Sequence, residues 1–170
     1  MPKLNETKVL PYSSKTMFEL VMDIEKYPEF LPWCKQAKIV NKISQNHIHA
    51  DLMVNFKGFY EKYRSDVKSH TDSHGNYFIE TKAISGPFKN LVSTWKINDL
   101  NKFVNSPQII EIISQNKNLQ GLQKIENICE INFFIDFTFN SFLLEKMIAV
   151  IFEKASHKMI NSFEDRASKI

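Results

Sequence analysis

The five histidines are the side chains in this sequence best suited to proton or metal chemistry near neutral pH. Two of them, His47 and His49, are separated by a single residue in a segment that alternates polar and apolar residues. This spacing puts both imidazoles on one face of a strand. This spacing is the most metal-like in the chain, but zinc needs a third and usually a fourth ligand. The spacing identifies no third ligand. We therefore favour two solvated surface histidines and expect no metal site.

The other reactive residue types give no catalytic pattern. Glu80, Glu130 and Asp136 fall on the polar phase of their strands, which favours a solvated face over an acid–base pair. No serine has a nucleophile-elbow context, and four glycines without a phosphate-binding run give no support to nucleotide hydrolysis. Cys34 and Cys129 lack a C-x-x-C partner and are interpreted as buried reduced thiols. We expect neither an enzyme nor a cofactor.

Composition and charge indicate one globular domain over residues 1–170. The chain is 43% hydrophobic and 24% charged, with a net charge of +3 that permits weak attraction to anionic lipid or RNA. Lys3 to Leu10 is too short and too mixed for a signal peptide. Phe142 to Phe152 is far shorter than the ~20 residues of a membrane span. We expect a soluble, cytoplasmic protein.

The pattern along the chain predicts one strand, a small helical insert and then a long run of strands. The first strand covers Lys3 to Leu10. Ser13 or Ser14 then caps a first helix, and a second short helix, Glu25 to Phe30, follows it. Further strands are predicted near residues 37–43, 48–56, 59–68, 77–84, 88–97 and 129–139. Asp99 to Lys124 is interpreted as a long hairpin excursion into which the flanking strands extend.

The last predicted element is a long helix, capped by Asn140 or Ser141 and free of glycine and proline to the end of the chain. Its first half is apolar nearly all round, and such a helix must be covered on all sides. The sequence therefore predicts an α+β architecture in which a long antiparallel sheet curls around the C-terminal helix.

The stretch from Tyr27 to Cys34 reads Tyr-Pro-Glu-Phe-Leu-Pro-Trp-Cys. Its prolines make a stiff loop that either plugs a core or forms the lip of an apolar cavity. Large apolar side chains recur on the inner phase of the strands: Phe56, Phe59, Tyr63, Leu91, Trp95, Phe133, Phe137 and Phe139. They suit a tunnel for an apolar ligand and a well-packed core about equally.

Several of these segments match a known family. Pro-Tyr-Ser at 11–13, Tyr-Pro-x-Phe-Leu-Pro-x-Cys at 27–34 and Gly-Pro-Phe at 86–88 resemble the Coq10/RatA family, as do Leu91, Trp95 and the strand from Phe133 to Phe139. This family is part of the START-like, polyketide cyclase/dehydrase superfamily, and the resemblance covers nearly the whole chain. It implies a helix-grip fold: about seven curved strands around a long C-terminal helix, two short helices after the first strand, and a hydrophobic tunnel.

The Coq10 branch implies non-catalytic binding of ubiquinone or another prenyl lipid in support of respiration, and this is the function we favour. The expected ligand-binding residues are Phe30, Leu31, Trp33, Phe56, Tyr63, Phe88, Leu91, Trp95, Phe137, Met147 and Ile151. Of these, Phe30, Leu31, Trp33 and Phe88 are expected at an entrance, with Pro87, that touches the membrane. This hypothesis adds peripheral contact with the inner membrane to the cytoplasmic location.

The RatA branch implies instead a ribosome toxin that blocks association of the ribosomal subunits, with Lys62, Arg64 and Lys68 as the phosphate contacts. No mitochondrial presequence is visible, and in this respect the chain resembles a bacterial member of the family. A third and weaker hypothesis is a cyclase-like enzyme on an apolar substrate, for which no acid–base pair is present.

Overall fold

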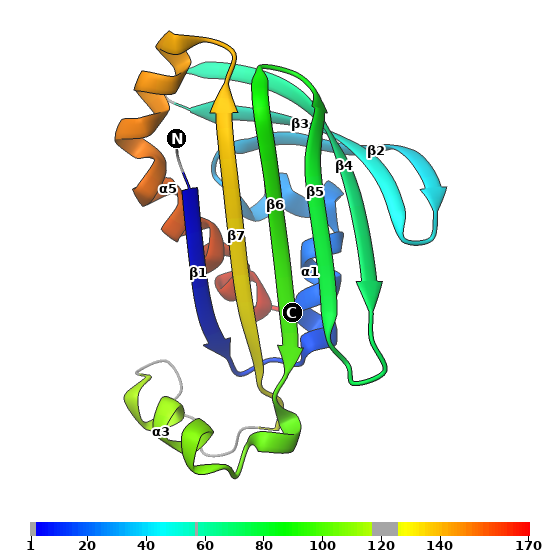
Figure 1. Ribbon diagram of the computed structural model, residues 1–170, viewed down its shortest axis with the longest axis vertical. Helices are drawn as coiled ribbons and strands as arrows, with labels where there is room; N and C mark the ends of the chain where they lie inside the picture. The colour runs from blue at the N-terminus through cyan, green and yellow to red at the C-terminus, as the bar shows by residue number, and fades with distance from the viewer. Residues whose placement is uncertain (1–2, 57, 117–125) are drawn as a thin grey trace.

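A seven-stranded antiparallel sheet dominates the computed structural model, which describes residues 3–56, 58–116 and 126–170, except the side chains of Phe56, Ile151 and Glu153. The strands lie in the order β1-β7-β6-β5-β4-β3-β2 (Figure 1). Their bounds are β1 Lys3–Leu10, β2 Cys34–Ser44, β3 His47–Phe56, β4 Phe59–Thr71, β5 Tyr77–Ser85, β6 Phe88–Asp99 and β7 Cys129–Phe139. All six predicted strand segments after β1 are present, as is β1 itself, which confirms the sheet.

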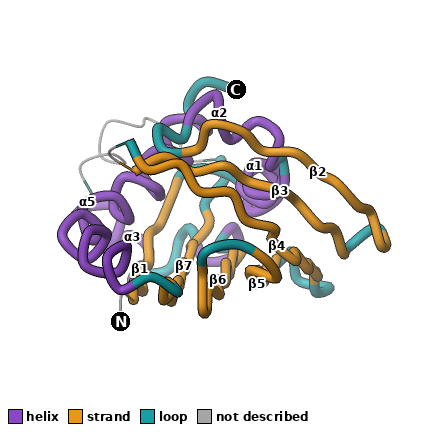
Figure 2. The backbone as a smooth tube through the Cα atoms, turned by 90° about the horizontal axis from the view of Figure 1, so that it is seen from above, coloured by secondary structure: helices purple, strands orange, loops and turns teal. Residues whose placement is uncertain are grey.

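Short helices follow the first strand and a long helix follows the last strand, as predicted. α1 (Ser14–Met22), η1 (Ile24–Lys26) and α2 (Tyr27–Phe30) separate β1 from β2, and α5 (Phe142–Ala167) follows β7. The Ser13 hydroxyl accepts a hydrogen bond from the Thr16 N–H at 3.0 Å, and Ser141 caps α5 in the same way. Figure 2 shows β2 and β3 curled over to lie across from β6 and β7, with α5 along the open side. This arrangement is the helix-grip fold.

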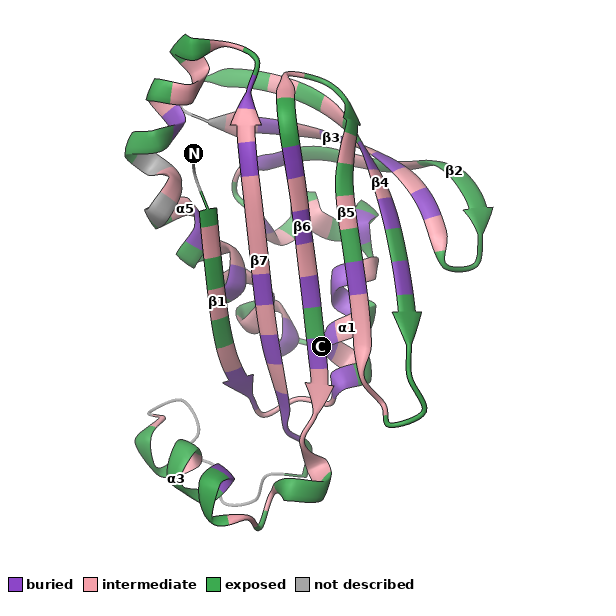
Figure 3. Ribbon diagram, in the orientation of Figure 1, coloured by how far each residue is buried: buried purple, intermediate pink, exposed green. Residues whose placement is uncertain are grey.

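Along most of the strands, buried residues alternate with more exposed ones, which separates the two faces of the sheet (Figure 3). Inner-phase residues such as Ala50, Val67, Ile79 and Ile97 are buried, whereas their outer neighbours are partly or fully exposed. Burial of each large aliphatic side chain contributes ~1.5–3 kcal/mol, which fixes the register because a one-residue slip would expose them all. Phe59, predicted to be on the inner face, is 40% exposed at the start of β4.

The prediction of a hairpin between Asp99 and Lys124 is wrong. The chain instead forms η2 (Asn101–Phe103) and the helix α3 (Pro107–Gln115), whose buried Ile109 packs with Val9 and Ile128. Ser106 caps α3 by accepting a hydrogen bond from the Ile109 N–H, and Pro107 fits the first turn because a helix needs no N–H there. Residues 117–125 of the segment lie outside the described part of the chain.

The two halves of α5 are held differently. The second half is tied to its surroundings by three polar contacts: the ion pairs Lys8–Glu164 with β1 and Glu29–Arg166 with α2, and a hydrogen bond between Glu6 of β1 and His157. The first half leaves Phe142, Leu143 and Val150 at 74%, 65% and 83% exposure, so the expectation that it is covered on all sides is wrong. In this first half, only the side of α5 that faces β7 is covered. Within the described residues, no helix has the length and apolar character needed to cross a bilayer.

Candidate functional site

The segment from Tyr27 to Cys34, called the Tyr27 loop below, comprises α2 and the connection to β2, and it closes one end of the space between the sheet and α5. The Tyr27 hydroxyl donates a hydrogen bond to the Val21 carbonyl, and burial raises the pKa of Tyr27 far above its ordinary value. Phe30 packs edge-on against Phe163 of α5, with ring centroids 5.1 Å apart. Leu31 is only 4% exposed, so the prediction that it touches a membrane is wrong. The loop therefore plugs the core with one part and walls a cavity with another.

The Gly-Pro-Phe segment builds the opposite wall. Gly86 has a φ of +121°, a conformation that favours glycine, and it passes directly over Tyr63. This close approach sets Phe88 edge-on to Tyr63, with ring centroids 5.2 Å apart, and stacks it on Phe139 at 4.7 Å. Burial raises the pKa of Tyr63 well above its usual range. Gly86 thus positions the aromatic wall of the cavity.

Two adjoining cavities lie between the sheet and α5. The first, of about 90 Å³, is lined by Trp33, Val54, Tyr63, Phe88, Leu91, Ile135, Phe137, Phe139, Ile148, Phe152, Ala155, Ser156 and Met159. The second, of about 110 Å³, extends the space toward the Tyr27 loop, with Leu31, Leu52, Val67, Trp95, Phe133 and Phe163 among its lining residues. Trp33, Val54, Tyr63, Leu91, Ile135 and Met159 line both. A cavity of ~150 Å³ holds one benzene molecule, so each space is small for a ligand.

The structure brings most of the predicted site residues to these cavities. Trp33, Tyr63, Phe88, Leu91 and Phe137 line the first, and Leu31 and Trp95 line the second. Phe30 and Met147 line neither, because Phe30 packs on Phe163 and Met147 lies one position away from the inward face of α5. The side chains of Phe56 and Ile151 lie outside the described part of the structure.

α5 contributes residues that the sequence analysis missed. Ile148, Phe152, Ala155 and Met159 face the cavity at intervals of four, three and four residues. This spacing is a helical stripe, and it was visible in the sequence. The apolar character of the whole first half of α5 hid it, because several rotations of the helix bury comparable numbers of apolar side chains.

The cavity lining favours binding over proton transfer. Among the described residues, the lining of both cavities contains no carboxylate, imidazole, ammonium or guanidinium group. Its most acidic candidate group, the Cys34 thiol, has a pKa raised to about 11 by burial. Such a site offers dispersion and hydrophobic contact and a few hydroxyls, which suits an apolar ligand.

The cations expected to contact phosphate lie on the outer face of the sheet, next to aspartates. Arg64 donates two hydrogen bonds to Asp51, at 2.7 and 3.0 Å, and Lys62 lies 3.9 Å from the same carboxylate. Lys68 lies 3.7 Å from Asp66. The hydrogen bond from Arg64 is the main reason why the pKa of Asp51 is lowered, against a smaller effect of burial. These three cations are therefore partly neutralised within the fold.

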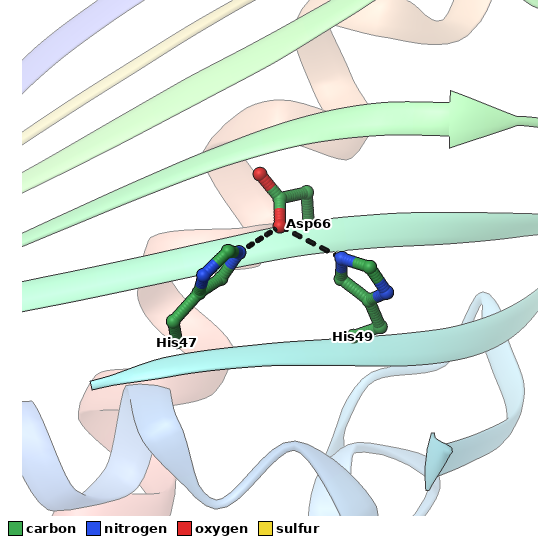
Figure 4. Close-up of side chains that lie close together, drawn as sticks. All are labelled: His47, His49 and Asp66. Carbon is green, nitrogen blue, oxygen red and sulfur yellow. Dashed lines mark hydrogen bonds and ion pairs between the residues drawn. The ribbon is translucent and has the colours of Figure 1, made fainter. Parts of the chain in front are cut away.

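A second group of polar side chains meets farther along the same face. His47 and His49 of β3 both point to the carboxylate of Asp66 on β4 (Figure 4). The Nε2 atom of His49 lies 3.0 Å from Asp66 Oδ1, which His47 also contacts. Asp66 is the third polar partner that the spacing of the histidines could not identify.

Comparison with known proteins gives consistent matches over the whole chain. The family model described as "Polyketide cyclase / dehydrase and lipid transport" matches residues 10–164. The chain is 38% identical over 170 residues to "Ribosome association toxin RatA" of Rickettsia prowazekii, covering 100% of this chain and 99% of the relative. It is 26% identical to "Coenzyme Q-binding protein COQ10 homolog B, mitochondrial" of Xenopus laevis, covering 98% of this chain and 58% of that protein.

Among solved structures, the Zhui aromatase/cyclase of a Streptomyces species has the same fold. It superposes with a TM-score of 0.70, covering 99% of this chain and 94% of that one, at 11% sequence identity. At that identity the likeness concerns the fold alone. It shows that the β1–α5 framework is shared with that protein.

Proposed function

Because this chain belongs to the polyketide cyclase/dehydrase and lipid transport family, and within it to the Coq10/RatA group, we propose that it is a ribosome-associating protein of the RatA type. The observation that carries this proposal is the full-length match, at 38% identity, to a protein named as a ribosome association toxin. The match to the coenzyme Q-binding relative is weaker, at 26%. The proposed action is to bind a ribosomal subunit and hinder its association with the other subunit. No catalytic step is involved.

The outer face of β2–β5 is the surface we assign to the ribosome. The strand register aligns Lys38, Asp51 and Arg64 across three strands on this face. The face carries five cations and three carboxylates: Lys38, Lys62, Arg64, Lys68 and Lys82 against Asp51, Asp66 and Glu80. Lys38 and Lys82 have no ion-pair partner among the described residues, so they are free to meet phosphate. A positive excess on a broad sheet face suits contact with the RNA backbone.

Co-sedimentation with purified ribosomal subunits tests the ribosome proposal. We expect the protein to sediment with one subunit at low salt and to be released as salt rises, because each phosphate contact releases counterions. A Lys38→Glu/Lys82→Glu double variant should bind at least about tenfold more weakly. Lys102→Glu, at an exposed position in η2, is the control and should bind like the parent. No sedimentation at low salt, or equal loss in the control, would contradict the proposal.

A second candidate function, binding of an apolar lipid such as a prenylquinone, rests on the cavities. Their lining is aromatic and aliphatic, and both tryptophans of the sequence, Trp33 and Trp95, are part of it. Each buried methylene of a tail would contribute ~0.8 kcal/mol. The volumes of about 90 and 110 Å³ are too small for a quinone ring and tail together. We therefore propose that a tail enters only when the first half of α5 moves away from β7.

The contacts of α5 support movement of its first half. Ile148 packs with Leu91, Phe137 and Phe139, and a hydrogen bond from the Phe139 N–H to the Glu145 carboxylate, at 2.8 Å, ties this half to β7. The three polar contacts with β1 and α2 hold only the second half. The exposed Phe142, Leu143 and Val150 give the same half a surface that can enter a bilayer interface. Lys146 lies 4.8 Å from the centre of the Phe142 ring, which adds a cation suited to anionic lipid.

Tryptophan fluorescence tests the lipid proposal. A short-tailed ubiquinone should quench the emission of Trp33 and Trp95 with a saturable, one-to-one dependence, because both rings line the cavities. Phe137→Asp, in the lining, should abolish the saturable phase, provided that circular dichroism shows a folded protein. Linear quenching without saturation would count against a lipid site and leave the ribosome proposal standing, since the two assays use different surfaces.

A further inference from the structure

The cluster of His47, His49 and Asp66 lies on the outer face of the sheet, opposite to the face that lines the cavities. His47 and His49 are two residues apart in β3, so their rings emerge on the same side. The register pairs His49 directly with Asp66 of β4, which places the carboxylate between the two rings. Figure 4 shows the three side chains converging on one point. Backbone hydrogen bonds of two neighbouring strands thus hold all three in place.

The donor atoms have the separations that one metal ion needs. One nitrogen from each ring and one carboxylate oxygen all lie within 4.8 Å of one another. A tetrahedral zinc ion with bonds of 2.0–2.2 Å holds its ligand atoms about 3.4 Å apart, so small side-chain rotations suffice. The ion would take the place of the hydrogen bonds that the two rings now make to Asp66 Oδ1. Two imidazoles and one carboxylate are a ligand set typical of zinc sites with an open position.

We propose that His47, His49 and Asp66 form a binding site for one divalent transition-metal ion of the zinc class, with water in the fourth position. All three side chains are partly buried, at 19–27% exposure, so they are restrained but can be reached from solvent. A shallow hollow of about 230 Å³, with Asp66, Lys68, Glu80 and Lys82 among its lining residues, adjoins the site at Asp66. Calcium and magnesium are excluded as the preferred ions, because they need mostly oxygen ligands.

The charges around the cluster set its affinity. The Lys68 ammonium lies 3.7 Å from the other oxygen of Asp66. Lys82 of β5 stands opposite Asp66 of β4 in the strand register. These cations repel a metal ion and lower its affinity.

Calorimetric titration of the full chain with Zn²⁺ tests the site. We expect one ion per chain, with no comparable signal for Mg²⁺. His49→Ala and Asp66→Asn should each weaken Zn²⁺ binding at least about tenfold, since even the loss of an outer partner of a metal ligand costs 10–100-fold. His74→Ala is the control, because His74 is an exposed histidine in the turn between β4 and β5. It should bind like the parent.

Two further measurements keep the test independent of folding. Lys68→Met leaves all three ligands in place, and we expect it to bind Zn²⁺ several-fold more tightly than the parent because a repelling charge is gone. Co²⁺ bound to the parent should give the visible absorption bands of a four-coordinate nitrogen–oxygen site, and His49→Ala should not. Absence of Zn²⁺ binding in the folded parent would overturn the proposal. Equal affinity in the parent, His49→Ala and Asp66→Asn would also overturn it.

Discussion

Gly86 lies so close to Tyr63 that a β-carbon at position 86 would come within 2.6 Å of the Tyr63 Cβ. The same β-carbon would lie 2.9 Å from the Lys62 carbonyl oxygen, which belongs to the β4 backbone and cannot move aside. The contact joins the Gly-Pro-Phe segment to β4 at Tyr63, whose side chain lines both cavities. It gives a physical reason for glycine in that segment.

Gly86→Ala should therefore destabilise the protein by about 3 kcal/mol or more, as the sum of backbone strain of ~1–3 kcal/mol and a clash with β4. Gly58→Ala is the matched control. Gly58 also has a positive φ, of 89°, but no atom lies within 4 Å of its added β-carbon. Gly58→Ala should therefore lower the free energy of unfolding by only about 1 kcal/mol. Urea unfolding of both variants measures the difference. Equal losses would show that the contact with Tyr63 is not responsible.

Ala155→Leu should fill part of the first cavity. An unfilled cavity costs about 24 cal/mol per Å³, so filling the space of about 90 Å³ can raise the free energy of unfolding by up to about 2 kcal/mol. The same substitution should weaken saturable quenching by a short-tailed quinone. Ala149→Leu, on the exposed side of α5, should change neither quantity. A loss of more than about 1 kcal/mol in Ala155→Leu would mean that other side chains already occupy this space.

The Asp51–Arg64 pair predicts a specific pH dependence. The native pKa of Asp51 is lowered, chiefly by the hydrogen bond from Arg64, so its contribution is present above the unfolded pKa near 4 and is lost as pH falls through the native value. The free energy of unfolding of the parent should exceed that of Asp51→Asn by under about 1 kcal/mol at pH 7, and this difference should vanish toward pH 2. Denaturant titrations at several pH values measure it. Asp165→Asn, a change to an exposed aspartate of α5, serves as control, and a difference that grows on acidification would contradict the assignment.

Both cysteines should be unreactive in the native protein. Burial raises the pKa of Cys34 to about 11 and that of Cys129 to about 12, so at pH 8 about one Cys34 in a thousand is thiolate. A thiol reagent such as dithionitrobenzoate should detect almost no reaction in native buffer. It should find two thiols per chain in guanidinium chloride. Fewer than two in the unfolded chain, or rapid native reaction, would contradict the buried reduced state.

The sheet was predictable because alternation along each strand is a local signal. The inner phase of β7 from Cys129 to Phe139 and of β3 from Ile48 to Val54 follows directly from the sequence. α3 was missed because its four isoleucines form one short apolar cluster in a segment that is otherwise rich in asparagine and glutamine. Ser106-Pro107 was nevertheless a helix-start signal, and it preceded isoleucines at helical spacing.

The candidate sites depended on long-range geometry that local patterns do not contain. The rotation of α5, which turns Ile148 rather than Met147 toward the cavity, is set by packing against β7. The meeting of His49 with Asp66 is set by the β3–β4 turn. Phe56 pairs with Phe59, so partners on these strands have residue numbers that sum to 115, as 49 and 66 do. A correct register for that one hairpin would have identified the third side chain.

The position of β1 has a consequence for synthesis. Among the strands that the structure describes, β1 pairs only with β7, and more than a hundred residues separate the two in the chain. Contacts over such a distance form late, because the intervening loop must close before they yield any stabilisation. During translation the first strand therefore stays without its β7 partner until more than a hundred further residues have been made. A protein that we propose to act on ribosomes thus cannot complete its own sheet until the ribosome that makes it has added β7.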